Sequence, residues 1–179
     1  MRVISGMARG RRLKEPVGFD IRPTSDMVKE SVFNIIQFDI EGRRVLDLYA
    51  GTGQLGIEAL SRGARSAVFV DSGAKSVKLI RENLDLCGFS DTASVYARDV
   101  PGFLENDEKF DLIFIDPPYG SPLAAKTIRR IIEFDKLNTN GIIVCETGIG
   151  DVLPDVLPPY SMQKEYKYGS VKITRYSRG

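Results

Sequence analysis

Strand-like runs alternate with helical patterns through the middle of the chain, and this alternation limits the possible folds more than any other feature. Runs rich in β-branched and aromatic residues occupy residues 44–48, 67–70, 93–97, 110–115 and 141–145. Helical patterns fill the gaps at residues 54–62 and 73–87 and from Ser121-Pro122 onward. Strand–helix alternation over about 100 residues is typical of a parallel, doubly wound α/β sheet. The sequence therefore predicts an α/β fold.

The two ends of the chain follow different patterns. Residues 162–168 and 171–176 alternate around Gly169-Ser170, which predicts an antiparallel β-hairpin. The length suits one core, so we expect a single domain over residues 1–179. Its expected parts are a basic β/loop extension (1–22), a leading helix (23–40) and the sheet core (41–179).

The leading helix is predicted from its cap and its apolar spacing. Thr24-Ser25-Asp26 can cap a helix in which apolar side chains recur on one face. These apolar residues are Val28, Val32, Ile35 and Ile36. We expect Lys29 and Glu30 to lie on the solvated face of this helix.

The chain contains no histidine and two cysteines, Cys87 and Cys145, which we expect to be buried and inert. The missing histidine excludes a Ser-His-Asp triad and a histidine-ligated zinc, and two cysteines are too few for a thiolate cage. No run of 18 apolar residues and no apolar leader segment is present. We therefore expect a cytoplasmic protein without a bound metal.

A net charge of +1 hides an uneven distribution of charge along the chain. Residues 1–14 carry five bases and no acid, residues 163–179 carry five bases and one acid, and the middle is acidic. Basic ends are often only solvated, but they also suit the phosphates of a nucleic acid. Three tyrosines alternate with bases near the C-terminus, where we expect them to pack: Tyr166, Tyr168 and Tyr176.

A glycine-rich turn follows the first predicted strand. Gly51, Gly53 and Gly56 fit the pattern G-x-G-x-x-G, which permits a tight turn and a close backbone approach to a ligand. Asp71 lies twenty residues after Gly51, at the end of the second strand, where a carboxylate can hold a ribose diol. The pattern predicts a nucleotide-like ligand without identifying it.

Aspartates lie within or just after the ends of the first four predicted strands: Asp47, Asp71, Asp99 and Asp116. In doubly wound sheets, ligands bind at this edge. A carboxylate such as Asp47 opposes a pyrophosphate but suits the cationic sulfonium of S-adenosylmethionine. Asp99 is placed to accept from an adenine amino group, with the Val100 backbone beside it. The predicted cofactor-binding residues are Asp47, Ala50, Gly51, Gly53, Gly56, Asp71, Ser72, Asp99 and Val100.

The most specific segment is Asp116-Pro117-Pro118-Tyr119, at the end of the fourth predicted strand. An exocyclic base amine is a poor nucleophile because its lone pair is delocalised into the ring. The Asp116 carboxylate and the Pro117 carbonyl can accept its two N–H groups, and the prolines stiffen the turn. Tyr119 offers a ring on which an extruded base can stack. We predict these four residues as catalytic.

With these motifs the chain resembles the bacterial 16S rRNA guanine-N2 methyltransferases of the RsmD type, a class I S-adenosylmethionine-dependent family. The resemblance runs through residues 2–13, residues 21–34, the glycine loop up to Ala64, and Asp-Pro-Pro-Tyr. It implies a Rossmann-like methyltransferase sheet, mostly parallel with an antiparallel C-terminal hairpin. It also implies methyl transfer from S-adenosylmethionine to a guanine N2 amine. The residues that it implies near the RNA are Arg9, Arg11, Arg12, Arg22 and Tyr119.

Three other functions remain open at this point. Asp-Pro-Pro-Tyr suits the N6 amine of adenine in RNA or DNA equally well, although the chain is short for a separate DNA-reading domain. A glycine-rich turn also occurs in NAD-dependent oxidoreductases. The third alternative is a non-catalytic rRNA-binding assembly factor. The resemblance implies that the partner is 16S rRNA, either alone, in the small subunit or in an assembly intermediate. We also expect the protein to be a monomer.

Overall fold

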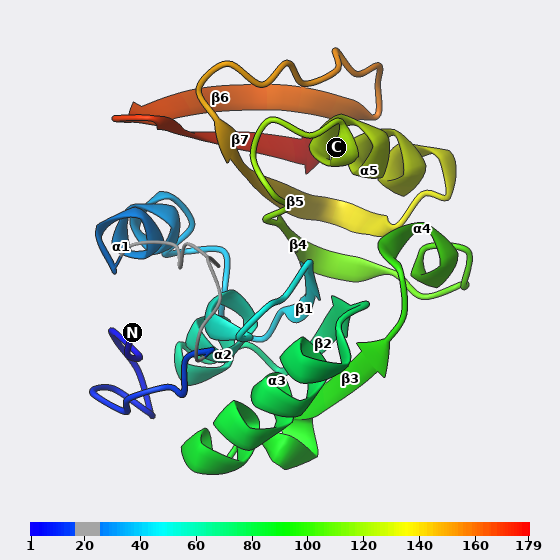
Figure 1. Ribbon diagram of the computed structural model, residues 1–179. Coiled ribbons are helices and arrows are strands. Elements are labelled where there is room, and N and C mark those ends of the chain that lie inside the picture. Colours follow the sequence, from blue (N-terminus) through cyan, green and yellow to red (C-terminus); the bar gives the residue numbers. More distant parts are fainter. Residues whose placement is uncertain (17–25) are drawn as a thin grey trace.

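The computed structural model describes residues 1–16 and 26–179, in which a seven-stranded sheet carries helices on both faces (Figure 1). The strands are β1 (Arg44–Leu48), β2 (Ser66–Asp71), β3 (Ala93–Ala97), β4 (Phe110–Ile115), β5 (Leu137–Gly148), β6 (Tyr160–Tyr168) and β7 (Val171–Arg178). The helices are α1 (Asp26–Ile35), α2 (Gln54–Ser61), α3 (Ala74–Cys87), α4 (Val100–Phe103) and α5 (Leu123–Glu133), with a 3-10 helix η1 (Ser90–Thr92).

The strand order, β3-β2-β1-β4-β5-β7-β6, reverses direction between β1 and β4. The first five strands are parallel, whereas β7 is antiparallel to both β5 and β6. This confirms the predicted doubly wound sheet with an antiparallel C-terminal hairpin. In such sheets a crevice forms where the order reverses, at the carboxyl ends of the strands. The loops after β1 and β4 therefore meet there.

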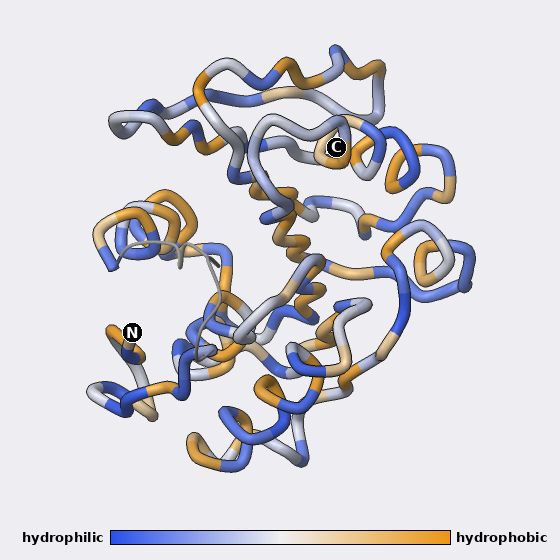
Figure 2. Tube along the Cα trace, in the orientation of Figure 1, coloured by the Kyte–Doolittle hydropathy of each residue, from blue (hydrophilic) through white to orange (hydrophobic). Residues whose placement is uncertain are grey.

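Each central strand contributes to two hydrophobic cores because successive side chains point to opposite faces of the sheet. In β1, Val45 joins the core that contains the apolar faces of α1, α2 and α3, whereas Leu46 joins the core that contains those of α4 and α5. Figure 2 shows the hydrophobic colour concentrated along the central strands, between the helical layers. This packing on both faces explains why β4 reads as a nearly continuous apolar run.

β5 is longer than the predicted run at residues 141–145, since it begins at Leu137 and ends at Gly148. Leu137 pairs with Phe110, but the register then shifts before Leu112 pairs with Ile142. The polar Asn-Thr-Asn sequence and this irregularity conceal the first part of the strand from an analysis of periodicity.

The helix ends also differ from the predictions. α5 has Pro122 at its N-cap, one residue later than predicted, and Ser121 Oγ donates instead to the Pro118 carbonyl at 2.7 Å. The short helix α4 was not predicted, although the Asp99 N-cap and the following Pro101 are its signal. α1 is described from Asp26, so the predicted cap residues 24–25 lie outside the described residues.

Lys29 is buried, not solvated as predicted, with none of its side chain exposed. Its ammonium donates to the Arg2 carbonyl and lies 3.4 Å from Glu58 Oε2. The same Glu58 carboxylate accepts from the backbone N–H groups of Ile4 and Ser5 at 2.8 and 2.9 Å. The prediction was wrong because the N-terminal segment (residues 1–16) covers this side of α1. Burial lowers the pKa of Lys29, and the neighbouring Glu58 opposes that shift.

Candidate active site

The glycine loop joins β1 to α2 at the reversal of the strand order. Gly51 and Gly53 have φ values of 56° and 78°, a left-handed conformation that strongly favours glycine. Gly53 is the N-cap of α2 and provides no side-chain cap, and the Asp47 carboxylate accepts from the Gly56 N–H in the first turn of this helix. The buried Ala50 accepts from Gly53 N at 2.7 Å and closes the turn. The loop thus presents backbone rather than side chains to the crevice.

Asp71 ties the glycine loop to the next loop. Its Oδ2 accepts from Gly51 N at 2.9 Å, and its Oδ1 accepts from Gly73 N at 2.8 Å. The side chain is half-buried at the end of β2, and the neighbouring Ser72 is exposed. The predicted ribose-binding carboxylate is therefore held by two backbone donors beside the glycine turn.

Asp47 lies beneath the glycine loop instead of on its surface. Its side chain is 1% exposed, and its Oδ2 accepts from Gly56 N at 2.9 Å. Burial raises the pKa of the Asp47 carboxyl to about 7; the hydrogen bond from Gly56 opposes this shift, and the negative charge of Asp71 adds to it. In this structure Asp47 therefore supports the first turn of α2 from below.

Gly56 lets α2 pack closely on the sheet. A Cβ atom there would lie 2.3 Å from Phe69 Cε1 and 3.1 Å from Asp47 Oδ2. This matches the packing role of the third glycine in a G-x-G-x-x-G turn. Gly56 is buried, so its part in the site is to seat the helix that carries the loop.

Asp99 and Val100 lie at the start of α4, after β3. Asp99 is exposed, and its Oδ1 accepts from Gly102 N at 3.0 Å as the cap of that helix. Val100 is buried. One oxygen of the carboxylate predicted to meet an adenine amine therefore caps α4, a role that the sequence pattern did not indicate.

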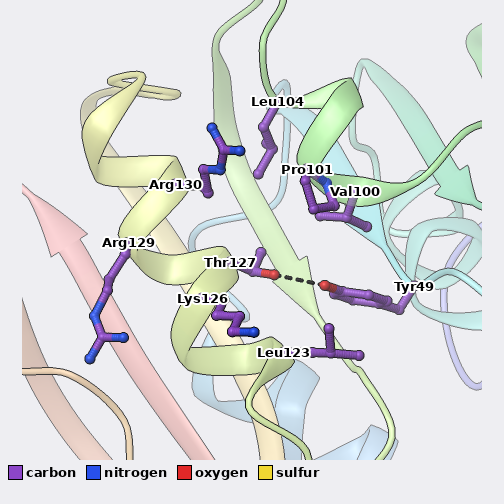
Figure 3. Close-up of a pocket in the computed structure, with 9 residues that line it drawn as sticks. All are labelled: Tyr49, Val100, Pro101, Leu104, Leu123, Lys126, Thr127, Arg129 and Arg130. Atoms are coloured by element: carbon purple, nitrogen blue, oxygen red, sulfur yellow. Dashed lines mark hydrogen bonds between the residues drawn. The ribbon is translucent and has the colours of Figure 1, made fainter.

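A cavity of about 290 Å³ adjoins this position, between α4 and α5 (Figure 3). Tyr49 Oη and Thr127 Oγ1 lie 2.8 Å apart across it, and Tyr49 has a φ of 60°. Of the predicted cofactor residues, only Val100 lines this cavity. The other lining residues were not predicted, because the periodicity of the sequence does not indicate them. The lining residues are Tyr49, Val100, Pro101, Leu104, Leu123, Lys126, Thr127, Arg129 and Arg130.

Asp-Pro-Pro-Tyr follows β4 directly, beside the end of β1. Asp116 N lies 3.5 Å from the Leu48 carbonyl, which aligns the segment with the start of the glycine loop. Asp116 is half-buried, Pro117 is buried and Pro118 is exposed. Tyr119 is 38% exposed. The geometry therefore brings the predicted catalytic segment and the glycine loop to neighbouring strand ends.

Two acidic residues hold this segment, Glu146 in β5 and Asp151 just after β5, and neither was predicted from the sequence. Tyr119 Oη donates to Glu146 Oε1. Gly120 N donates to both carboxylate oxygens of Asp151, each at 3.2 Å. Both contacts span more than 20 residues, so spacing along the chain gave no signal for them.

The predicted RNA-binding arginines Arg9, Arg11 and Arg12 lie exposed on the N-terminal segment, and Arg22 lies outside the described residues.

The buried Asn83 of α3 links the N-terminal segment to the glycine loop. Its amide donates to the carbonyls of Lys14 at 3.2 Å and Thr52 at 3.0 Å, and its Oδ1 accepts from Lys14 N at 2.7 Å. The basic segment and the loop therefore share one anchoring side chain.

The basic C-terminal end is largely neutralised within the fold. Three of its five bases form ion pairs: Lys172 with Glu165, Arg175 with Asp39 and Arg178 with Asp135, at 3.0–3.2 Å. The tyrosines pack as predicted: Tyr176 is fully buried, and Tyr166 and Tyr168 pack against the core. Charge counting along the chain overstated the free positive charge at this end.

Within residues 1–16 and 26–179, no cluster of three or more His, Cys, Asp or Glu residues is arranged to hold a metal ion. Over the same ranges, no helix is both long and apolar enough to cross a membrane. Both cysteines are buried and free, and burial raises the pKa of each thiol.

Comparisons with known proteins identify relatives over nearly the whole chain. A family model described as "Conserved hypothetical protein 95" matches residues 1–177. The Bacillus subtilis protein YlbH is 39% identical over 99% of both chains. "Ribosomal RNA small subunit methyltransferase D" of Escherichia coli K12 is 30% identical over 99% of this chain and 90% of that protein. Among solved structures, yhhF of Escherichia coli superposes with a TM-score of 0.88, with 32% identity over 99% of this chain and 97% of that one.

Proposed function

Since the chain belongs to the family described as "Conserved hypothetical protein 95", we propose that it methylates the N2 amine of a guanine in 16S rRNA, with S-adenosylmethionine as the methyl donor. Relatives named ribosomal RNA small subunit methyltransferase D, at 30% and 36% identity, confirm the family resemblance found in the sequence. The observation that carries the proposal is Asp116–Tyr119, placed after β4 beside the glycine loop that follows β1.

The cofactor fits the residues that are present. Gly51 and Gly53 leave bare backbone at the start of α2, and Asp71 supplies a carboxylate for a ribose. The mostly apolar cavity beside Val100 suits an adenine ring. When bound, S-adenosylmethionine supplies an electrophilic methyl group on a sulfonium. We propose that Ala50, Ser72 and Asp99 complete the site, and that Asp47 and Gly56 support it from below.

The contribution of the catalytic segment is to orient and activate the amine. Asp116 Oδ and the Pro117 carbonyl accept the two N–H groups of the guanine amine, which directs its lone pair toward the methyl group. The Tyr119 ring stacks on the extruded base. Methyl transfer would form the N–C bond and release S-adenosylhomocysteine, and the proton lost by the amine would pass to the Asp116 carboxylate or to solvent water. No histidine is needed in this scheme.

The substrate side of the proposal rests on charge. Arg9, Arg11 and Arg12 are exposed on a segment that Asn83 of α3 anchors, and Asn83 also donates to the Thr52 carbonyl of the glycine loop. Cationic side chains near phosphates supply affinity without sequence specificity. We propose 16S rRNA, alone or in the small subunit or its precursor, as partner, and hence a cytoplasmic location. We further propose that residues 1–179 act as one domain and as a monomer.

The decisive experiment is the substitution Asp116→Ala, with Asp91→Ala as matched control on the exposed η1 turn. We expect Asp116→Ala to lower turnover by at least about a thousandfold, because an amine acceptor is lost, while the affinity for S-adenosylhomocysteine stays within threefold. Nucleoside mass spectrometry after reaction with small subunits and deproteinised rRNA identifies the product. N2-methylguanosine supports the proposal; N6-methyladenosine, or near-wild-type turnover of Asp116→Ala, contradicts it.

A further inference from the structure

Glu146 is a buried carboxylate at the site to which the proposed reaction gives no role. It lies on β5 and is 3% exposed. Ile115 of β4 pairs with Cys145 of β5, so the next residues lie side by side: Asp116 directly after β4, and Glu146 near the end of β5. Tyr119 Oη donates a hydrogen bond to Glu146 Oε1. A buried group on the next strand thus holds the exposed ring of the catalytic segment.

A second contact holds the same segment from the same side. The Asp151 carboxylate accepts from Gly120 N at 3.2 Å and from Gly148 N at 2.9 Å. A Cβ atom on Gly148 would lie 3.5 Å from Tyr119 Cβ, so the backbone of β5 lies directly against the tyrosine. Glu146 thus holds the phenol of Tyr119, and Asp151 holds the backbone of the following residue, Gly120. The Glu146 contact is made to the phenol itself and so acts directly on the orientation of the ring.

We propose that Glu146 is a positioning residue that fixes the Tyr119 ring in the orientation in which the target base stacks on it. The proposal rests on the proposed function. A half-exposed tyrosine has rotational freedom that must be lost when a base stacks on it. A hydrogen bond from the phenol to a buried carboxyl removes that freedom beforehand. Glu146 itself need not touch the RNA.

Four variants test this: Glu146→Leu, Glu146→Gln, Tyr119→Phe and the double variant Glu146→Leu/Tyr119→Phe. Leucine removes the acceptor at similar size, whereas glutamine keeps a carbonyl that can accept from the phenol. We expect Glu146→Leu and Tyr119→Phe each to lower kcat by about tenfold or more, with the KM for S-adenosylmethionine within twofold. Glu146→Gln should stay within threefold of wild type. The double variant should be no slower than the slower single variant.

Three results would overturn the proposal: wild-type kcat in Glu146→Leu, a loss in Glu146→Gln equal to that in Glu146→Leu, or fully additive losses in the double variant. The last would mean that the two residues act independently. If Glu146→Leu does not fold, the volume-conserving pair Tyr119→Phe and Glu146→Gln still decides, because only the first should lose activity.

A readout without methyl transfer separates this proposal from the proposed function. The protein labelled with 3-fluorotyrosine has seven tyrosine signals by ¹⁹F NMR, and Tyr119→Phe identifies that of Tyr119. Glu146→Leu should move the Tyr119 signal toward its position in the unfolded chain, and Glu146→Gln should not. An unmoved signal in Glu146→Leu overturns the positioning role even in an active enzyme. Failure of the wild type to methylate guanine overturns the proposed function alone.

Discussion

For a single residue such as Asp47, the position in a sequence motif does not reveal the role that the side chain has in the structure. Its place within the first strand suggests a ligand contact, but its carboxyl is buried against Gly56 N. Burial raises its pKa from the ordinary 3.8 to about 7. Between these two values the folded protein keeps the proton while the unfolded chain releases it. Asp47 therefore makes folding stability fall as the pH rises from about 4 to 7.

The substitution Asp47→Asn tests this linkage, because asparagine can keep the acceptor for Gly56 N and cannot ionise. Relative to Asp47→Asn, the wild type should lose about 3 kcal/mol of unfolding free energy between pH 4 and pH 7, and little more above pH 7. Urea unfolding at a series of pH values measures the difference. A difference that is constant with pH would show that Asp47 has an ordinary pKa.

At the scale of elements, α2 lies close to the sheet because Gly56 has no side chain. Its backbone faces the buried ring of Phe69, which has no room to move in a closed core. The distance between α2 and β2 in turn sets the height of the glycine loop above the strand ends. A packing requirement on one glycine thus controls the geometry of the proposed cofactor site.

We expect Gly56→Ala to destabilise the protein by about 3 kcal/mol, because a Cβ atom would overlap the Phe69 ring. Thermal or urea unfolding measures the loss. Gly150→Ala is the matched control: a Cβ there meets nothing within 4 Å, so its effect should stay within about 0.5 kcal/mol. Equal stabilities of the two variants would show that α2 does not pack as described.

On the scale of the whole molecule, the described bases divide into structural and available ones. Lys29, Lys172, Arg175 and Arg178 belong to ion pairs within the fold. Arg9, Arg11 and Arg12 are exposed on the N-terminal segment and make no ion pair among the described residues. The net charge of +1 describes neither group. Exposed bases without an ion pair among the described residues therefore include this cluster on the N-terminal side, next to α2 and α3.

The triple variant Arg9→Gln/Arg11→Gln/Arg12→Gln should bind 16S rRNA more weakly. The slope of log K against log salt should become shallower by about two, because up to three phosphate contacts are lost. Affinity for S-adenosylhomocysteine should stay unchanged. Arg65→Gln, exposed at the amino end of β2, is the control and should keep the wild-type slope. An unchanged slope in the triple variant would place the RNA elsewhere.

The strand–helix alternation, the glycine turn and the Asp-Pro-Pro-Tyr segment are all evident from the amino-acid sequence. These are local patterns: periodicity, turn residues and strand ends each depend on neighbours a few positions apart. They suffice to predict the doubly wound sheet and to place the motifs at one edge, since parallel strands end on the same side.

Which charged groups are exposed and which form ion pairs within the fold depends on the tertiary structure. Lys29 meets Glu58, Tyr119 meets Glu146 and Arg178 meets Asp135 across 27 to 43 positions of the chain. No period or spacing encodes such pairs, because they depend on which strand lies beside which and on what covers a helix face. The burial of Asp47 has the same origin: its pKa depends on the close packing of α2 above it.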